Sequence, residues 1–286
     1  LAADTSKYPG EKRMAYETLL VDVDKKVAKV TLNRPEKRNS MNPQLVRDMV
    51  AVLEEIRYLD EVSVLVITGS GNSFCAGMDL KEFFYQLKNK NPHEYDRVTR
   101  DVVEFRGRTL PHYPKVTIAM VNGYCFGGGF PLVEGCDLAI APDEAVFGLS
   151  EINFRMFPGG LASRSIGNIF RPRDGLFYAL TGDTFTGKRA AEMGFVNYSV
   201  PLARLEAEVM GLAHRIAEKD PVALKAAKDA YRFSQEMSYD AAINYSAAKE
   251  QEVFLAQKGA WVDAGIGDFL QHKYKPGLGG HEKVGG

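Results

Sequence analysis

The stretch Gly123–Glu151, GYCFGGGFPLVEGCDLAIAPDEAVFGLSE, carries the main structural signals of this chain. It follows an apolar run, Val116–Val121, that is typical of a buried strand. Three consecutive glycines, Gly127–Gly129, stand where that strand leads into a helix, so the backbone can adopt positive φ angles and a ligand can approach the bare amides. The stretch ends on an acid, Glu151. Backbone donors beside one carboxylate predict an oxyanion hole with a proton-transferring group.

The composition is that of a folded protein with one main core. The chain has 286 residues, of which 45% are hydrophobic, and this length suffices for a sizeable core with a smaller appended unit. The formal net charge of −1 creates no overall basic field, so we expect no nucleic acid as a partner. No apolar run approaches the ~20 residues of a membrane span, so we expect no membrane partner. Met14 is typical of a native start and leaves residues 1–13 as an N-terminal extension without a signal peptide's apolar centre.

Cysteines and histidines show no spacing that is typical of a metal site. Cys75, Cys125 and Cys136 stand in apolar surroundings without a CxxC motif, which predicts buried free thiols and a cytoplasmic location. The histidines are expected at the surface. The glycine cluster is not a dinucleotide fingerprint, which would need glycine at Leu132, and no Gly-Lys-Ser/Thr follows it. We therefore expect neither a metal nor a resident cofactor.

Strands and helices alternate over the first two thirds of the chain. The segment that ends at Asn33 is an expected strand, and Asn42 is an expected N-cap for an amphipathic helix over 43–59. Residues 62–68 predict a buried strand, so the order indicates a largely parallel α/β fold. From residue 187 onward we expect helices alone, chiefly 201–218, 221–236 and 239–258.

Residues 85–112 are polar and charged, and they predict a mobile loop followed by a surface helix. We interpret the cations of this segment as part of a solvated face rather than as a phosphate site. These cations are Lys88, Lys90, Arg97, Arg100, Arg106 and Arg108.

The segment Ser73–Phe84, SFCAGMDLKEFF, is the second informative stretch. The small pair Ala76-Gly77 precedes Met78, and Asp79 can cap the helix that starts there. Such a turn presents its amides to the glycine loop if the two parent strands are neighbours. A plain strand-to-helix turn without a ligand fits the residues equally well.

From Met14 onward, several ordered blocks resemble the crotonase (enoyl-CoA hydratase/isomerase) superfamily. The matching blocks are NRPEKRN (33–39), SFCAGMDL (73–80), AMVNGYCFGGGF (119–130), GCDLAIA (135–141), FGLSEIN (147–153) and AAEMGFVN (190–197). The sequences of the blocks at 119–130 and 147–153 are most similar to the hydroxycinnamoyl-CoA (feruloyl-CoA) hydratase-lyases of that superfamily. The resemblance implies a spiral of ββα units over 14–200 with two roughly perpendicular sheets. It also implies a helical C-terminal region, 201–286, that mediates a homotrimer or a dimer of trimers.

The resemblance assigns the chemistry to two amides and one acid. The family's oxyanion donors fall on Met78 and Gly128. Its two glutamate positions fall on Pro131 and, twenty residues later, Glu151, so a mechanism with two glutamates is not available to this chain. One carboxylate, Glu151, can still add water to an enoyl thioester and then cleave the product to an aromatic aldehyde and acetyl-CoA. Glu134, one turn beyond Pro131, is expected at a helix surface.

The resemblance also implies an acyl-CoA partner and the residues that bind it. The acyl pocket would include Pro131, and the tyrosines that bind the substrate phenol in the subgroup fall on Phe83 and Ala247. The tyrosines that could substitute, although each alone more often serves packing, are Tyr245, Tyr239 and Tyr85.

The coenzyme part would lie along the early basic turn. Arg34, Lys37 and Arg38 match the family's nucleotide-contact region, although a solvated loop remains an alternative. The backbone groups expected to flank the adenine belong to Ala76, Asp79 and Leu80. Coenzyme A would thus arrive as part of the substrate, with no other cofactor.

Two other functions remain open at the level of sequence. The first is an enoyl-CoA hydratase or double-bond isomerase that acts on another acyl-CoA. The second, from a different class, is a non-catalytic homologue that binds RNA or serves as a scaffold. The near-neutral charge and the retained Glu151 favour an enzyme.

Overall fold

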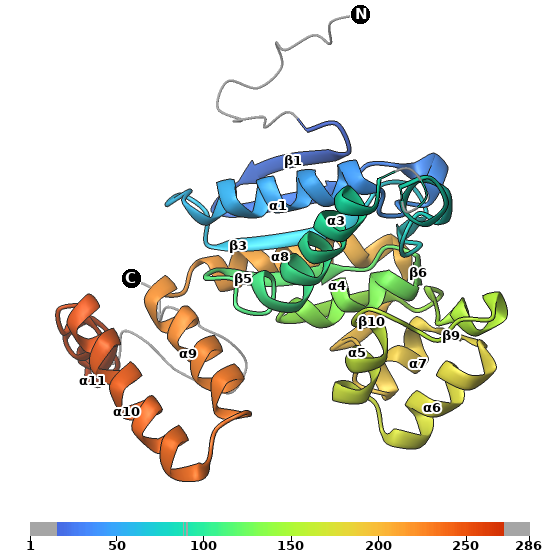
Figure 1. Ribbon diagram of the computed structural model, residues 1–286. Helices are drawn as coiled ribbons and strands as arrows, with labels where there is room; N and C mark the ends of the chain where they lie inside the picture. Colours follow the sequence, from blue (N-terminus) through green and yellow to red (C-terminus); the bar gives the residue numbers. More distant parts are fainter. Residues whose placement is uncertain (1–15, 88, 90, 272–286) are drawn as a thin grey trace, which may run out of the picture. The chain divides into compact units, whose positions relative to one another are not determined.

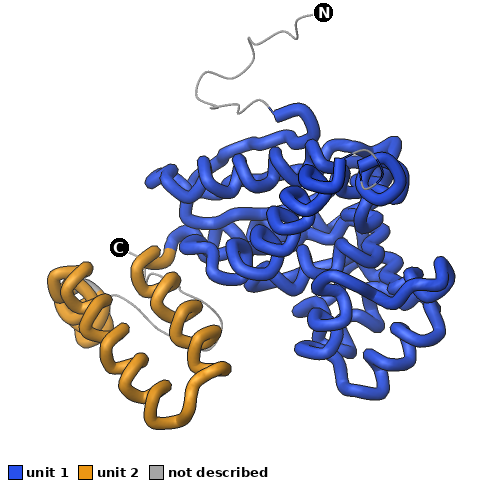
Figure 2. Tube along the Cα trace, viewed as in Figure 1, with its two compact units in different colours: residues 1–218 blue, residues 219–286 orange. Residues whose placement is uncertain are grey.

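The computed structural model describes residues 16–271 except 88 and 90, so the expected extension over 1–13 lies outside the described residues. The chain divides into two compact units, residues 1–218 and 219–286 (Figure 2), and each is described by itself. The sequence placed this boundary after residue 200. It lies after Glu218 because helix α8 (Leu202–Ala217) packs on the sheet of the first unit.

The first unit contains two sheets. The larger has the order β1-β2-β3-β5-β7-β10 and is parallel except for the antiparallel pair β1–β2. Its strands are β1 (Leu19–Asp24), β2 (Val27–Leu32), β3 (Val64–Gly69), β5 (Val116–Met120), β7 (Leu138–Pro142) and β10 (Tyr198–Val200). The smaller has the order β4-β6-β8-β9, in which only β8–β9 is antiparallel. Its strands are β4 (Ser73–Cys75), β6 (Tyr124–Phe126), β8 (Val146–Gly148) and β9 (Thr184–Thr186).

The connections follow a ββα repeat, as expected. In each of the pairs β3/β4, β5/β6 and β7/β8, the first strand joins the larger sheet, the second joins the smaller, and helices follow. Strand β10 departs from the expectation of helices alone after residue 187. Three residues are too few to show a strand period, and pairing with β7 creates this strand.

Helices cover both faces of the larger sheet. The helical segments of the first unit are η1 (Pro35–Lys37), α1 (Pro43–Arg57), η2 (Leu80–Leu87), α3 (Pro92–Glu104), η3 (Phe105–Thr109), η4 (Gly127–Gly129), α4 (Phe130–Gly135), η5 (Ser150–Phe154), α5 (Ala162–Ile169), α6 (Pro172–Thr181), α7 (Gly187–Glu192) and α8. The Asn42 side chain accepts a hydrogen bond from the Leu45 N–H at 2.9 Å, which confirms the predicted N-cap of α1.

The alternation of side chains along β3 separates two apolar layers. Leu65 and Ile67 pack in the main core with the apolar face of α1, whereas Val64 and Val66 pack with α8. In Figure 1, α1 and α8 accordingly lie on opposite sides of β3. This burial of both faces explains why β3 is apolar throughout its length.

The second unit is helical, as expected for the C-terminal region. Its elements are α9 (Pro221–Ser234), α10 (Tyr239–Ala256), η6 (Trp261–Ile266) and α11 (Gly267–Leu270). Asp220 and Ser238 cap the first two helices through their side-chain oxygens. Among the described residues of both units, no helix is long and apolar enough to cross a bilayer.

Candidate active site

Two backbone loops meet where the neighbouring strands β4 and β6 end. Cys75 and Cys125 are paired in parallel register, which fulfils the condition set by the sequence. Gly77 has a φ of +88°, and a Cβ atom added to it would lie 3.0 Å from the Gly128 nitrogen. Glycine at position 77 therefore allows the turn after β4 to approach the glycine loop after β6 closely.

Among the residues that the structure describes, the amides of Met78 and Gly128 have no acceptor, so both can donate to a ligand. Met41 bridges the turn, because its N–H donates to Gly77 O at 2.7 Å and its carbonyl accepts from Asp79 N at 2.9 Å. The Met78 N–H takes part in neither bond. Gly128 lies in the first turn of the η4–α4 helix, where N–H groups have no intrahelical acceptor. A Cβ added to Gly128 would lie 3.3 Å from Met78 Cγ, so the two residues are neighbours.

Glu151 lies beside this loop, one residue into η5. A Cβ added to Gly127, whose φ is +46°, would lie 2.5 Å from Glu151 Oε1. Glu151 Oε2 is buried and accepts no hydrogen bond from the described residues. Burial raises the pKa of the Glu151 carboxyl above its ordinary value. A carboxylate with an unused oxygen and a raised pKa is suited to accept a proton from a small molecule.

The neighbouring helix α4 contributes no second acid to this loop. Pro131 is buried at the start of α4 and carries no ionisable group. Glu134 faces α5 instead, where its Oε1 accepts from Asn168 Nδ2 at 3.0 Å, in agreement with the expected surface position.

Arg106 is a residue that the sequence reasoning placed wrongly. It was expected on a solvated face, but it is only 3% exposed. Its Nη1 donates to the Gly128 carbonyl at 2.7 Å, and its Nε donates to Val102 O at 3.1 Å. Val98, Val102 and Arg106 recur at intervals of four, so helical spacing could have placed Arg106 on the buried face. Arg97, Arg100 and Arg108 are exposed, as expected.

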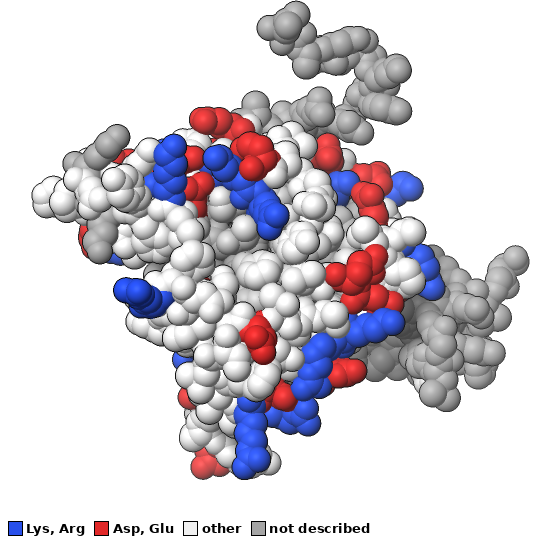
Figure 3. Space-filling model, turned by 90° about the vertical axis from the view of Figure 1, so that its right-hand side faces the viewer, with Lys and Arg blue, Asp and Glu red and all other residues white. Residues whose placement is uncertain are grey.

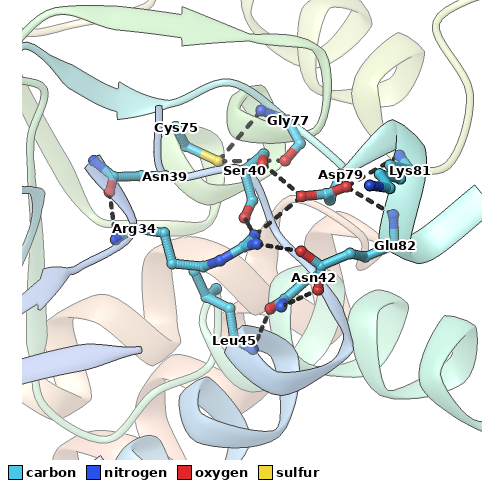
Figure 4. A network of polar contacts seen from close by, with 10 residues as sticks. All are labelled: Arg34, Asn39, Ser40, Asn42, Leu45, Cys75, Gly77, Asp79, Lys81 and Glu82. Atoms are coloured by element: carbon cyan, nitrogen blue, oxygen red, sulfur yellow. Dashed lines mark hydrogen bonds and ion pairs between the residues drawn. The ribbon is translucent and has the colours of Figure 1, made fainter. Parts of the chain in front are cut away.

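Arg34 is the centre of a buried network rather than a free cation (Figure 4). Its guanidinium donates to Ser40 O at 2.6 Å, to Asp79 Oδ2 at 3.2 Å and to Glu82 Oε1 at 2.7 Å. Arg34 is 7% exposed. The carboxylates of Asp79 and Glu82 already neutralise the charge of Arg34, so this side chain does not fit the expected role at a phosphate.

The polar groups of Asp79 likewise make their hydrogen bonds within the chain. Its carboxylate accepts from the N–H groups of Lys81 and Glu82, at 3.0 and 2.8 Å, which confirms the predicted helix cap. Its own N–H donates to Met41 O, and its carbonyl accepts from Phe83 N at 3.0 Å. The expected backbone contact of Asp79 with an adenine is therefore not supported.

Two cations of the early turn remain accessible. Lys37 and Arg38 are exposed, and the Arg38 guanidinium carbon lies 5.0 Å from the centre of the Tyr124 ring. The Ala76 N–H donates to Arg38 O at 2.9 Å, which ties this turn to the loop after β4. Leu80, the first residue of η2, has an exposed side chain.

Of the residues expected at the acyl group, Phe83 lies in the first unit. Its buried ring contacts Phe84 and Tyr95, with ring centres 5.2 and 5.5 Å apart. Tyr245 and Tyr239 belong to the second unit. There Tyr245 packs against Phe233 and Tyr239 is 81% exposed.

The described residues contain no cluster of histidine, cysteine and acidic side chains that could hold a metal ion. Cys75, Cys125 and Cys136 are buried and form no disulfide, as predicted. Burial raises the pKa of the Cys75 thiol to about 11, so it is protonated at neutral pH.

Comparisons with known proteins agree with this geometry. A family model described as enoyl-CoA hydratase/isomerase matches residues 22–274. A hydroxycinnamoyl-CoA hydratase-lyase of Pseudomonas fluorescens is 42% identical over 269 residues, which are 94% of this chain and 98% of the relative. A 2,3-dehydroadipyl-CoA hydratase of Escherichia coli K12 is 34% identical, over 89% of this chain and 96% of the relative.

A solved structure shows the same fold. The crystal structure of an enoyl-CoA hydratase from Bacillus anthracis superposes with a TM-score of 0.81 at 26% identity, and the match covers 90% of this chain and 97% of the other. The ββα repeat agrees with this likeness. The chain therefore belongs to the enoyl-CoA hydratase/isomerase family and is an enzyme.

Proposed function

We propose that the protein hydrates a phenylpropenoyl-CoA of the feruloyl- or p-coumaroyl-CoA type and cleaves the product to an aromatic aldehyde and acetyl-CoA. The observation that carries this proposal is the lone carboxylate of Glu151, whose free oxygen lies beside the glycine loop. The hydratase-lyase relative, at 42% identity, supports the same substrate class.

In the first step, Glu151 accepts a proton from water while the water oxygen bonds to Cβ of the thioester. The electrons of the Cα–Cβ double bond move toward the thioester carbonyl, which becomes an enolate. The N–H groups of Met78 and Gly128 hold the enolate oxygen, and the proton on Glu151 then passes to Cα. One carboxylate suffices because it returns the proton that it accepted.

In the second step, Glu151 accepts the proton of the β-hydroxyl group. The Cα–Cβ bond breaks, the carbonyl of the aldehyde forms at Cβ, and the bonding electrons form the enolate of acetyl-CoA. The same two amides hold this enolate until Glu151 protonates its Cα. Both steps thus place negative charge on one oxygen atom, which explains why one hole serves both.

The coenzyme would bind along the exposed side of the early turn. Lys37 and Arg38 are the cations that we assign to its phosphates, with Ala76 and Leu80 beside the adenine. Arg38 is held by its contact with the Tyr124 ring and by the hydrogen bond from Ala76, so it is already ordered for an anionic ligand.

The acyl pocket would include Pro131 and Phe83, both of which are buried. The ring of Tyr95, on helix α3, lies beside the Phe83 ring, and we assign to its hydroxyl group the contact with the substrate's aromatic hydroxyl group.

We further propose a homotrimer or a dimer of trimers. Large apolar side chains are exposed on α6, at Leu176, Phe177 and Leu180, and on α10, at Leu255. On the face shown in Figure 3, residues other than Lys, Arg, Asp and Glu cover much of the middle, and charged residues of both signs surround them. The exposed apolar side chains carry the argument for an interface. Apolar surface of this kind is typical of an interface between subunits.

A second candidate function is hydration or isomerisation of another enoyl-CoA. Phe83 favours it, because a ring without a hydroxyl group cannot hydrogen-bond a phenol. The relatives named as hydratases, such as the one from Escherichia coli, support the same candidate.

Product analysis distinguishes the two candidates. The protein is incubated separately with feruloyl-CoA and with crotonyl-CoA, and the products are identified by chromatography with mass detection. Vanillin and acetyl-CoA in equal amounts from feruloyl-CoA would support the hydratase-lyase. A hydrated thioester without aldehyde would refute cleavage and show a hydratase. No detectable product from either substrate would contradict both the hydration and the cleavage step.

A further inference from the structure

Arg106 is a buried cation without an acidic partner among the described residues. Its side chain makes two hydrogen bonds, both to backbone carbonyls, and it forms no ion pair within the part of the chain that the structure describes. Burial lowers the pKa of Arg106 to about 10, so the guanidinium keeps its charge at neutral pH. A buried charge without a counterion costs folding free energy, and such a cost is expected where a charge serves a site.

The position of this charge relates it to the oxyanion hole. Nη1 of Arg106 holds the Gly128 carbonyl at 2.7 Å. A Cβ added to Gly128 would lie 3.1 Å from the same nitrogen and 3.3 Å from Met78 Cγ. The guanidinium therefore borders the residue pair whose amides we assign to the enolate oxygen.

We propose that Arg106 is a positioning residue for catalysis: it fixes the Gly128 peptide and places a permanent positive charge beside the oxyanion hole. This inference rests on the proposed function. The bond to the carbonyl restricts rotation of the peptide that follows the Gly128 amide, so that amide stays directed at the ligand. The buried charge acts in a medium of low dielectric, where its attraction for a developing enolate is much stronger than in water.

Three variants test the proposal kinetically. Arg106→Met removes the charge and both hydrogen bonds but retains most of the side-chain volume, and Arg106→Lys retains the charge and one donor. Arg108→Met is the matched control, because Arg108 is exposed and pairs with Glu104, the last residue of the preceding helix α3. We expect a kcat that is about ten- to a hundredfold lower for Arg106→Met, with KM changed less than threefold. Arg106→Lys should recover part of this loss.

A spectroscopic signature separates positioning from mere structural support. The probe is 4-(dimethylamino)cinnamoyl-CoA, whose absorption moves to longer wavelength when its thioester carbonyl is polarised. It is bound to proteins that also carry Glu151→Gln, so that water does not add. We expect a smaller red shift with Arg106→Met than without it, and an unchanged shift with Arg108→Met. The melting temperature of Arg106→Met should not fall, since an unpaired buried charge is removed.

The outcomes are distinct. A kcat and a red shift of Arg106→Met that match those of Arg108→Met would overturn the proposal while the proposed function stands. A loss of kcat that accompanies a lower melting temperature, with the red shift unchanged, would also overturn it. If the unsubstituted protein neither converts feruloyl-CoA or crotonyl-CoA nor shifts the probe, the proposed function fails and this inference fails with it.

Discussion

At the scale of single residues, the electrostatics of Glu151 make the first prediction. The raised pKa of this carboxyl means that the base loses its charge at a higher pH than an ordinary glutamate does. We therefore expect kcat/KM to fall as the pH is lowered through the raised pKa, and a pH–rate profile checks this. An activity that stays constant down to an ordinary glutamate pKa would exclude Glu151 as the base.

The same residue links catalysis to stability. Because its pKa is higher in the folded chain than in the unfolded chain, folding is favoured by protonation, and this contribution is lost as the pH rises through the folded pKa. Glu151→Gln should therefore be at least as stable as the parent at neutral pH, and the difference should vanish below the ordinary value of 4.5. Thermal unfolding at both pH values measures this, and a variant that is less stable at pH 7 would contradict it.

Gly127 makes a third prediction at this scale. A methyl group at Gly127 would meet Glu151 Oε1 at 2.5 Å, and its φ of +46° disfavours any residue with a Cβ. Gly127→Ala should thus displace the carboxylate and lower kcat by about a hundredfold or more, as expected for a misplaced catalytic group. Gly167→Ala is the control, because a Cβ there would meet nothing within 4 Å. Equal activities of the two variants would contradict the placement of Glu151.

At the scale of elements, the Arg34 network joins the early turn to the start of η2. Burial acts to raise the pKa of Asp79, but hydrogen bonds from the Glu82 N–H and from Arg34 outweigh it, so the pKa is lowered. This depressed pKa contributes stability that is present above the ordinary carboxyl pKa and is lost as the pH falls through the folded value. The network therefore contributes to the stability of the fold at neutral pH.

Arg34→Ala should lower the free energy of unfolding by about 3 kcal/mol, because it leaves two carboxylates without their buried partner. Lys37→Ala is the matched control on the same turn. The Lys37 side chain is exposed, so the free energy of unfolding of this variant should be unchanged while its KM for the thioester rises. Denaturant titrations and steady-state kinetics measure both quantities. A raised KM with unchanged stability for Arg34→Ala would restore Arg34 to the coenzyme site.

The sequence predicted an element well where the interactions that form it are between residues close together in the chain. Helices with local signals, such as α1 with its Asn42 cap, were predicted to within two residues. The boundary after Glu218 depends on α8 packing against strands from distant parts of the chain, which no local pattern reveals. Arg34 and Arg106 were misplaced for the same reason, since a charge in the sequence does not show which acid or carbonyl will meet it in the fold.

At the scale of the whole molecule, the parts of the candidate site lie in three short motifs that the sequence singled out. Gly77, Gly127 and Glu151 meet through the parallel pairing of β4, β6 and β8. From the sequence, the pairing of the first two of these strands was only a condition for the site, because no local pattern shows which strands are neighbours. The acyl pocket could not be predicted in the same way, because Phe83 and Tyr95 meet through the packing of η2 on α3.

Assembly is the prediction that belongs to this scale. We expect a particle of three or six chains of 31.7 kDa, which sedimentation velocity would resolve. Leu255→Asp should shift the particle toward single chains, because a charge would replace one of the exposed apolar side chains of α10. A parent protein that sediments as one chain at micromolar concentration would refute the proposed trimer.

The most direct measurement compares two acid-to-amide substitutions with feruloyl-CoA as substrate. Glu151→Gln should lower the production of vanillin and acetyl-CoA by about a thousandfold, as expected for loss of a general base, with the melting temperature maintained. Glu134→Gln, whose carboxylate faces Asn168 on α5, should retain the parent rate. An unchanged turnover of Glu151→Gln, or an equal loss in Glu134→Gln, would contradict a mechanism that depends on one carboxylate beside the Met78 and Gly128 amides.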